Sequence, residues 1–244
     1  MCRMLAAAGK FSMADVVEAV RAMATNANPA YGHELRERGD AFQHDSGWGA
    51  VYREGERLVR VRGTAPCFRD PLFDELAGVE SDLAVVHARR AKNPRTISTR
   101  NTHPFLATYL GEEWAFCHNG EVRDLSQLTW DPTLVADGST DSELLFFHIL
   151  TALGSGGPDA LARILSGIRD FTCVNCFLVR PGSVMAATRR APDSTLPRYY
   201  TMWRADGAGP AGRFTLVSSE IVPVRDAVWR SLEDGSAMLL TQPR

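Results

Sequence analysis

Residues 2–8, CRMLAAA, form a short apolar run at the very start of the 244-residue chain. A run of this length, bounded by the polar residues that follow, predicts a buried β-strand. Directly after it, Ser12 precedes apolar residues at positions 13, 16, 17, 20 and 23, the spacing of one helix face. The sequence therefore begins with a strand and then a helix.

Further strands are expected outward from this start. Residues 47–53 and 57–62 flank Glu54-Gly55, which predicts a hairpin. Residues 83–89, LAVVHAR, form another strand, and residues 113–120, EWAFCHNG, form one that ends at Asn-Gly. Together with residues 2–8, five strands are thus expected before the middle of the chain.

Helices are expected next. Thr140, followed three residues later by Glu143, is a capping box that predicts a helix through LLFFHIL. Residues 154–158 interrupt it, and residues 159–168 form a second helix. Helices grouped between two sets of strands favour an α+β layered fold over alternating βαβ units, and we expect residues 1–244 to form a single domain. The later strand-like stretches are 172–179, 183–190, 198–203, 213–220 and 237–240.

Composition excludes several classes of protein. The chain has 27 basic and 29 acidic residues, so nothing indicates a nucleic-acid partner. No apolar run approaches the roughly 18 residues that span a bilayer, and the N-terminus does not resemble a signal peptide. We therefore expect no membrane partner and a cytoplasmic protein, in which the five cysteines are free thiols.

Cys2 directly follows the initiator methionine. Methionine aminopeptidases accept small second residues, so Cys2 is expected to become the first residue of the mature chain. Its α-amine, with an unperturbed pKa of about 7.7–8.0, would then lie beside its own sulfur and could act as the base that activates it. The alternative is a small apolar residue in an edge strand.

Further motifs follow Cys2 in a fixed order. With the N-terminal cysteine they resemble the class II (N-terminal nucleophile) glutamine amidotransferases, above all the small free-standing members, which include the hydrolase of ergothioneine biosynthesis. The resemblance is strong to about residue 150 and weaker to about residue 240. It implies a four-layer αββα sandwich of the N-terminal-nucleophile hydrolase type. The motifs are MCRML (1–5), HDSGWG (44–49), HARRA (87–91), NTHPF (101–105), FCHNGEV (116–122), TDSE (140–143) and VSSE (217–220).

The resemblance also implies roles for single residues. Asn119 and Gly120 would supply the oxyanion hole, the first through its side-chain amide and the second through its backbone N–H. The alternative is a hairpin turn, because Asn-Gly is a strong turn signal. Arg89 would hold the α-carboxylate of glutamine with its two-pronged guanidinium, whereas Arg90 would point to the opposite strand face, toward the solvent or an interface. Asp141 would pair with the α-ammonium group, although an acid in a first helical turn also stabilises the helix without a ligand.

Three more residues are weaker candidates for substrate binding. His103 and His118 could orient the Cys2 amine, the substrate or the Asn119 segment, and Trp48 would pack beside the N-terminal strand. Ser218, Ser219 and Glu220 are expected to hold the central sheet together. The remaining cysteines are expected in the core: Cys173 and Cys176 would point to opposite faces of a strand, and so would Cys117 and its neighbour His118.

The function implied is a cysteine amidohydrolase acting on the γ-carboxamide of glutamine or a γ-glutamyl amide through a thioester on Cys2. It needs no metal or organic cofactor. Because the chain is expected to end with this domain, it would serve a separate synthase subunit, or act alone as a hydrolase with water as the acceptor. A catalytically silent binding protein is the third alternative. The polar loop over 26–45 is a hypothetical lid.

Overall fold

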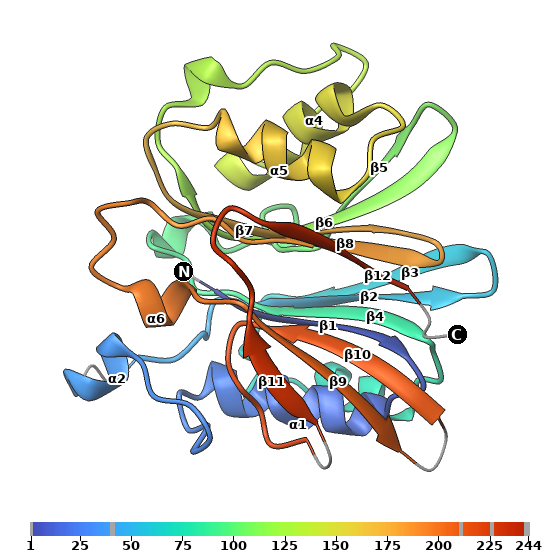
Figure 1. Ribbon diagram of the computed structural model, residues 1–244, viewed down its shortest axis with the longest axis vertical. Helices are drawn as coiled ribbons and strands as arrows, with labels where there is room; N and C mark the ends of the chain where they lie inside the picture. Colours follow the sequence, from blue (N-terminus) through green and yellow to red (C-terminus); the bar gives the residue numbers. More distant parts are fainter. Residues whose placement is uncertain (1, 40–41, 210–211, 225–226, 242–244) are drawn as a thin grey trace.

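The computed structural model describes residues 2–39, 42–209, 212–224 and 227–241. Two antiparallel sheets lie face to face, with helices on both outer sides (Figure 1). Helices α4 and α5 cover one sheet and helix α1 covers the other. The α+β prediction and the four-layer αββα arrangement are both confirmed.

Strand β1, Arg3–Gly9, lies inside the larger sheet, between β10 and β4. Every residue of β1 is buried, because both of its faces are covered. In the described part of the chain this sheet has seven strands, in the order β11-β9-β10-β1-β4-β2-β3. Their bounds are β2 Trp48–Glu54, β3 Arg57–Gly63, β4 Leu83–Ala88, β9 Trp203–Gly209, β10 Gly212–Ser218 and β11 Val228–Ser231.

The smaller sheet is built around β6, Glu112–Val122, and β7, Phe171–Arg180. Five strands of the described chain form it, in the order β12-β8-β7-β6-β5. The others are β5 Phe105–Tyr109, β8 Ser183–Ala187 and β12 Ala237–Leu240.

Side-chain caps begin the two longest helices where the sequence predicts. The Ser12 hydroxyl accepts a hydrogen bond from the backbone N–H of Asp15, and α1 follows over Met13–Ala24. The Thr140 hydroxyl accepts one from Glu143, and α4 follows over Asp141–Leu153. Both helix starts are confirmed. Helix α5 covers Pro158–Ser166, and the shorter helical segments are α2 Glu34–Glu37, α3 Pro71–Glu75, α6 Pro197–Tyr200, η1 Cys67–Arg69, η2 Leu76–Gly78, η3 Pro94–Thr96 and η4 Leu125–Gln127.

The core between the two sheets is made from alternate residues of their strands. Met4, Ala6 and Ala8 of β1 lie there with Val85 of β4 and Phe177 of β7. Because successive strand residues point to opposite faces, Leu5 and Ala7 pack outward against α1 instead. This alternation decides which residues around β1 can reach the space between the sheets.

Two strand predictions are wrong at their ends. Residues 198–203 were expected as one strand, but α6 covers their first half and β9 starts only at Trp203. Pro197 at the first helical position favours this turn. The strand expected to end at Asn119-Gly120 continues to Val122, so these two residues do not form a hairpin turn.

No helix in the described ranges is both long and apolar enough to cross a bilayer. The expected cysteine positions are confirmed: Cys173 and Cys176 lie in different core clusters on either side of β7, and Cys117 lies between the sheets.

Candidate active site

Cys2 lies at the start of β1, where the space between the sheets opens into a cavity of about 410 Å³. The cavity is lined by residues that are far apart in the sequence. Cys2, Arg89, His103 and Asp141 all contribute to it. The fold therefore gathers most of the predicted site residues around the thiol.

Asn119 contacts the nitrogen of Cys2. This nitrogen donates a hydrogen bond to Asn119 Oδ1 at 2.7 Å, across 117 residues of sequence. The amide nitrogen Nδ2 of Asn119 is buried and has no hydrogen-bond partner among the described residues. A buried donor without a partner costs free energy, so Nδ2 is suited to an oxygen that arrives with a substrate.

Gly120 follows with a φ of 145°, beside an irregularity in the pairing of β6 with β7. A Cβ added at this position would lie 1.7 Å from the carbonyl oxygen of Cys173. Only glycine therefore fits between the two strands, and Gly120 lines the cavity next to Cys2.

Arg89 lies just after β4 and is 6% exposed. Its Nη2 donates to Thr96 Oγ1 at 3.2 Å, and its Nη1 lies 3.4 Å from the carbonyl oxygen of Ser46. Burial lowers the pKa of this guanidinium, and the charge of Cys2 opposes the effect. Arg89 is thus a fixed cation facing the cavity, as a carboxylate anchor requires.

Asp141 begins α4 and lines the same cavity. Its Oδ2 accepts a hydrogen bond from the backbone N–H of Val122 at 2.8 Å, which ties the helix to the end of β6. Asp141 therefore has a structural contact and also lines the cavity, and its role in substrate binding stays a prediction.

His103 and His118 both line the cavity and are buried. His118 lies between Ser142 Oγ, at 2.9 Å from Nδ1, and the Cys173 carbonyl oxygen, at 3.2 Å from Nε2. Neither ring nitrogen of His103 has a hydrogen-bond partner in the described chain. His118 is therefore occupied by structural contacts, whereas His103 keeps both nitrogens for a ligand.

Trp48 does not line the cavity, and its role in substrate binding stays a prediction. Its indole donates to Asp70 Oδ2 at 2.8 Å and packs edge-on against Phe73 at 4.9 Å. The glycine after it explains the GWG motif, because a Cβ at Gly49 would lie 2.0 Å from the carbonyl oxygen of His103.

Arg90 differs from its prediction. It was expected at the solvent or an interface, but it is half-buried, lines the cavity and lies over the Phe42 ring at 4.1 Å.

The thiol of Cys2 differs from the other four in its acidity. Burial raises the pKa of this thiol. The charges of His87 and of the amino terminus lower it, and so do hydrogen bonds from His87 and from the Arg90 backbone. These effects outweigh burial, and the pKa is lowered to about 6. Burial raises the pKa of the Cys67 and Cys176 thiols to about 12 and also raises those of Cys117 and Cys173. Cys2 is therefore the cysteine that carries a thiolate near neutral pH.

His87 is a site residue that the sequence analysis missed. It is completely buried on β4, opposite Met4 of β1, and its Nε2 lies 3.3 Å from the carbonyl oxygen of His118. The signal was available in the sequence. In a strand, His87 and Arg89 share one face, so placing Arg89 in the site also places His87 there.

Glu220 anchors the strand that carries Cys2. Its buried carboxylate lies 2.8 Å from Arg3 Nε and accepts a hydrogen bond from Asn28 Nδ2 at 2.8 Å. His33 and Arg36 approach it at 3.7 and 3.9 Å. The VSSE motif therefore ties β1 to the loop over 26–45, in line with its expected structural role.

The contacts with Glu220 concern the loop over 26–45, which is the hypothetical lid. Of the loop over 26–45, the described residues do not line the cavity. They pack next to it instead: His44 lies 3.0 Å from the Tyr199 hydroxyl, and Phe42 lies under Arg90, which lines the cavity. Asp40 and Ala41 of this loop lie outside the described residues.

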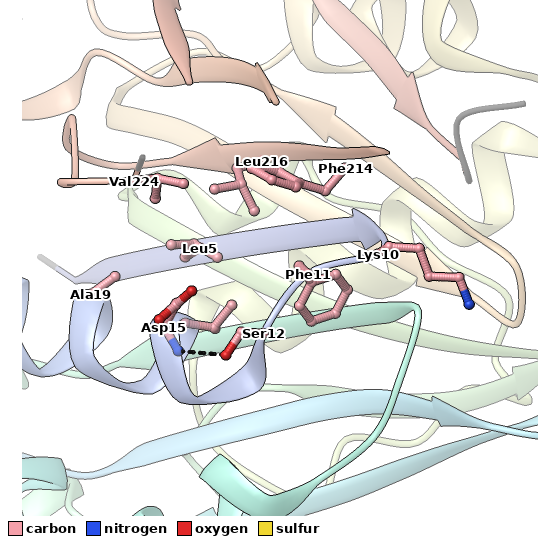
Figure 2. Close-up of a pocket in the computed structure, with 10 residues that line it drawn as sticks. Leu5, Lys10, Phe11, Ser12, Asp15, Ala19, Phe214, Leu216 and Val224 are labelled. Atoms are coloured by element: carbon pink, nitrogen blue, oxygen red, sulfur yellow. Dashed lines mark hydrogen bonds between the residues drawn. The ribbon is translucent and has the colours of Figure 1, made fainter. Parts of the chain in front are cut away.

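A second cavity, of about 190 Å³, lies on the other face of β1 (Figure 2). It is lined by Leu5, by Val16 of α1 and by Phe214 and Leu216 of β10. Because Leu5 and Cys2 point to opposite faces of the strand, this apolar hollow is separate from the thiol.

Comparison with known proteins agrees with this geometry. The family model of the class-II glutamine amidotransferases matches residues 22–171, which include Arg89, Asn119 and Asp141 and begin after Cys2. The match covers more than half of the chain. The chain therefore belongs to the class-II glutamine amidotransferase family, and the resemblance is confirmed.

Two curated relatives differ in how much of them is matched. YafJ of Escherichia coli (strain K12) is 30% identical over 181 residues, which cover 65% of this chain and 69% of YafJ. A Haemophilus influenzae relative is 32% identical over 108 residues, 43% of this chain. The chain spans only 36% of that relative's length.

Solved structures show the same fold at low identity. A predicted glutamine amidotransferase from Pseudomonas aeruginosa PA01 has a TM-score of 0.64 and 16% identity, with 98% of this chain and 97% of that chain covered. The glutamine phosphoribosylpyrophosphate amidotransferase of B. subtilis has a TM-score of 0.62 and 19% identity, with 98% of this chain and 47% of that chain covered.

Proposed function

We propose that the protein is a cysteine amidohydrolase that cleaves the γ-carboxamide of glutamine, or of a γ-glutamyl amide, through a γ-glutamyl thioester on Cys2. The observation that carries this proposal is the Cys2 thiol, with its lowered pKa, next to the buried Asn119 amide that lacks a partner. A nucleophile and an oxyanion donor are the two groups that acyl transfer requires.

The steps follow from the positions of the groups. The Cys2 thiolate attacks the γ-carbonyl carbon, and the oxyanion accepts hydrogen bonds from Asn119 Nδ2 and the Gly120 backbone. The nitrogen leaves as ammonia or an amine, and water then hydrolyses the thioester. Arg89 and Asp141, which line the same cavity, hold the α-carboxylate and α-ammonium groups.

Replacing the nucleophile tests this proposal. Cys2→Ala should abolish ammonia release from glutamine and from γ-glutamyl amides, while circular dichroism and the melting temperature stay close to wild type. Cys176→Ala is the matched control, since Cys176 is a buried thiol of the helix-side core. Turnover near wild type in Cys2→Ala would exclude the thioester mechanism.

The fate of the released nitrogen separates the two active alternatives. A glutaminase subunit passes ammonia to a separate synthase, whereas a stand-alone hydrolase prefers a γ-glutamyl amide or peptide with water as the acceptor. We propose to compare kcat/KM for free glutamine with that for γ-glutamyl amides. A silent binding protein would turn over neither, and its Cys2 would not be labelled by a glutamine-like diazo-ketone.

The same labelling experiment reports the state of the N-terminus. Met1 lies outside the described residues, so its removal stays a prediction. Intact mass of the labelled protein should show one adduct on a chain that starts at Cys2.

A further inference from the structure

We propose that Arg90 determines the specificity for the leaving group: together with the hydroxyl groups of Thr172 and Tyr200, it binds a carboxylate on the amine that departs. The substrate is then a γ-glutamyl amino acid, which is cleaved to glutamate and a free amino acid. This inference rests on the proposed function and selects the stand-alone hydrolase among its alternatives.

The backbone of Arg90 lies at the proposed nucleophile. Its N–H donates a hydrogen bond to the Cys2 thiol, and Arg90 lines the same cavity as that thiol. An amino-acid leaving group carries its carboxylate within about one residue length of the scissile carbon, roughly 3.8 Å. A side chain that binds this carboxylate must therefore start close to the sulfur, as that of Arg90 does.

The guanidinium groups of Arg89 and Arg90 contact different segments. Arg89 Nη2 donates to Thr96 Oγ1 at 3.2 Å, whereas the guanidinium of Arg90 lies over the Phe42 ring at 4.1 Å. Arg89 is assigned to the α-carboxylate of the glutamyl group. Arg90 is therefore placed to contact another part of the substrate.

Two hydroxyl groups lie on the Phe42 side of the cavity. Phe42 belongs to the same buried cluster as Tyr200, and Tyr200 and Thr172 both line the cavity. The side chains of Tyr200 and Thr172 are hydrogen-bonded to each other. Burial raises the pKa of Tyr200 to about 12, so its hydroxyl stays protonated and can donate.

This set of donors matches a carboxylate. A guanidinium binds a carboxylate through two parallel hydrogen bonds, and hydroxyl groups can add further ones. The five N–H donors of Arg90 allow it to keep contacts within the protein while it binds such a group. Ammonia, which is the leaving group of free glutamine, has no part that these donors could recognise.

The charges of the cavity lining also favour an anionic leaving group. A γ-glutamyl group brings one carboxylate and one ammonium group, so it adds no net charge. Burial lowers the pKa values of His103 and His118, which keeps both rings neutral. Apart from the thiol, the charged side chains among the described residues of the lining are three cations and two carboxylates: Arg89, Arg90 and Lys92, with Glu121 and Asp141.

The reaction needs only water as a second reactant. The sulfur forms a bond to the γ-carbon, the C–N bond breaks, and the thiol proton goes to the nitrogen, which leaves as the amine of the amino acid. Water then attacks the thioester: its oxygen bonds to the γ-carbon, the C–S bond breaks, and a proton returns to the sulfur. Nothing is oxidised or reduced.

The test uses two substrates that differ in one group. γ-Glutamylalanine carries the carboxylate, and γ-glutamylalanine amide carries a neutral carboxamide of the same size. The ratio of their kcat/KM values is measured in the full chain, because a purely structural defect would lower both values together. We expect the wild type to prefer γ-glutamylalanine at least about tenfold.

Three variants assign this preference to single side chains. Arg90→Gln should bring the ratio to about one, and Tyr200→Phe should lower it about threefold. Arg95→Gln is the control, since it removes an exposed cation of the same segment, and it should keep the wild-type ratio. If Arg90→Gln does not fold, Arg90→Lys replaces it: lysine keeps the charge without the fork, so the ratio should still fall severalfold.

A ratio of about one in the wild type, or a ratio that the Arg90 variant leaves unmoved, would overturn the inference. If the wild type cleaves glutamine and both alanine compounds equally well, the inference fails while the proposed function stands. If the wild type cleaves none of the three and the diazo-ketone does not label Cys2, both fail.

Discussion

The hydrogen bond between Cys2 and Asn119 couples the two main parts of the site. It places Asn119 Oδ1 on the nitrogen of Cys2, the proposed nucleophile, and leaves Nδ2 as a buried donor without a partner among the described residues. The strand that positions Asn119 also contains Gly120, whose backbone adopts a conformation that other residues avoid. The proposed nucleophile and the proposed oxyanion donors are therefore positioned by the same short contact between the sheets.

At the scale of single residues, Arg89→Lys should weaken substrate binding. The guanidinium is buried and held by Thr96 and Ser46, and a lysine replaces its fork with a point charge. We expect KM for glutamine to rise about tenfold, equivalent to about 1.4 kcal/mol, with a smaller change in kcat. Arg95→Lys is the control, since Arg95 is exposed nearby. An unmoved KM would show that Arg89 does not anchor the carboxylate.

At the scale of secondary structure, the path of β6 next to β7 depends on one glycine. Gly120→Ala places a Cβ against the Cys173 carbonyl at a positive φ. We expect a loss of about 3 kcal/mol in the free energy of unfolding, since strain and overpacking each cost about 1–3 kcal/mol. Gly111→Ala is the control, because its φ is also positive but its Cβ would meet open space. Chemical denaturation measures both, and equal losses in the two variants would contradict the steric explanation.

Short sequence patterns predicted the helices whose first residues are determined by their neighbours in the sequence. Ser12 and Thr140 start helices because their hydroxyls cap them. The strand expected through Tyr199 and Tyr200 was wrong, because aromatic residues favour strands only where they lie on a sheet surface. The Tyr199 ring instead lies under the Arg3 guanidinium at 3.7 Å, a contact across 196 residues that no local pattern encodes.

The candidate site was predictable where family motifs or alternation apply. Arg89, Gly120 and Asp141 line the cavity, and Asn119 contacts the Cys2 nitrogen. Trp48 does not line the cavity, since a motif says nothing about which face of a strand a side chain takes. Because residues 26–45 are mostly polar, the sequence did not indicate that part of this loop is buried. His33 and Asn28 look like loop residues in the sequence, yet they are completely buried next to Glu220.

At the scale of the whole molecule, four buried histidines make stability depend on pH. Burial lowers the pKa of His33 to about 3, those of His44 and His103 well below their usual value, and that of His118 as well. Below about pH 6.5 the unfolded chain binds protons at these positions that the folded chain does not. Stability is therefore complete above that pH and falls as the pH drops further.

We expect the melting temperature to fall steadily from pH 7 to pH 5. Each such group costs at most about 1.4 kcal/mol per pH unit in this window. Calorimetry across the window measures the slope, and His44→Gln should flatten it by the share of one group. A melting temperature that rises on acidification would show that other groups dominate.

The buried pair of Arg3 and Glu220 has a consequence for the newly made chain. Cys2 and Arg3 leave the ribosome before the carboxylate that holds their strand, because Glu220 follows Arg3 by 217 residues. Until then the strand lacks its anchor, and the partners that acidify the sulfur are not assembled around it. During synthesis Cys2 would thus have the reactivity of an ordinary cysteine. Its thiol would become more reactive only when the tertiary structure has formed.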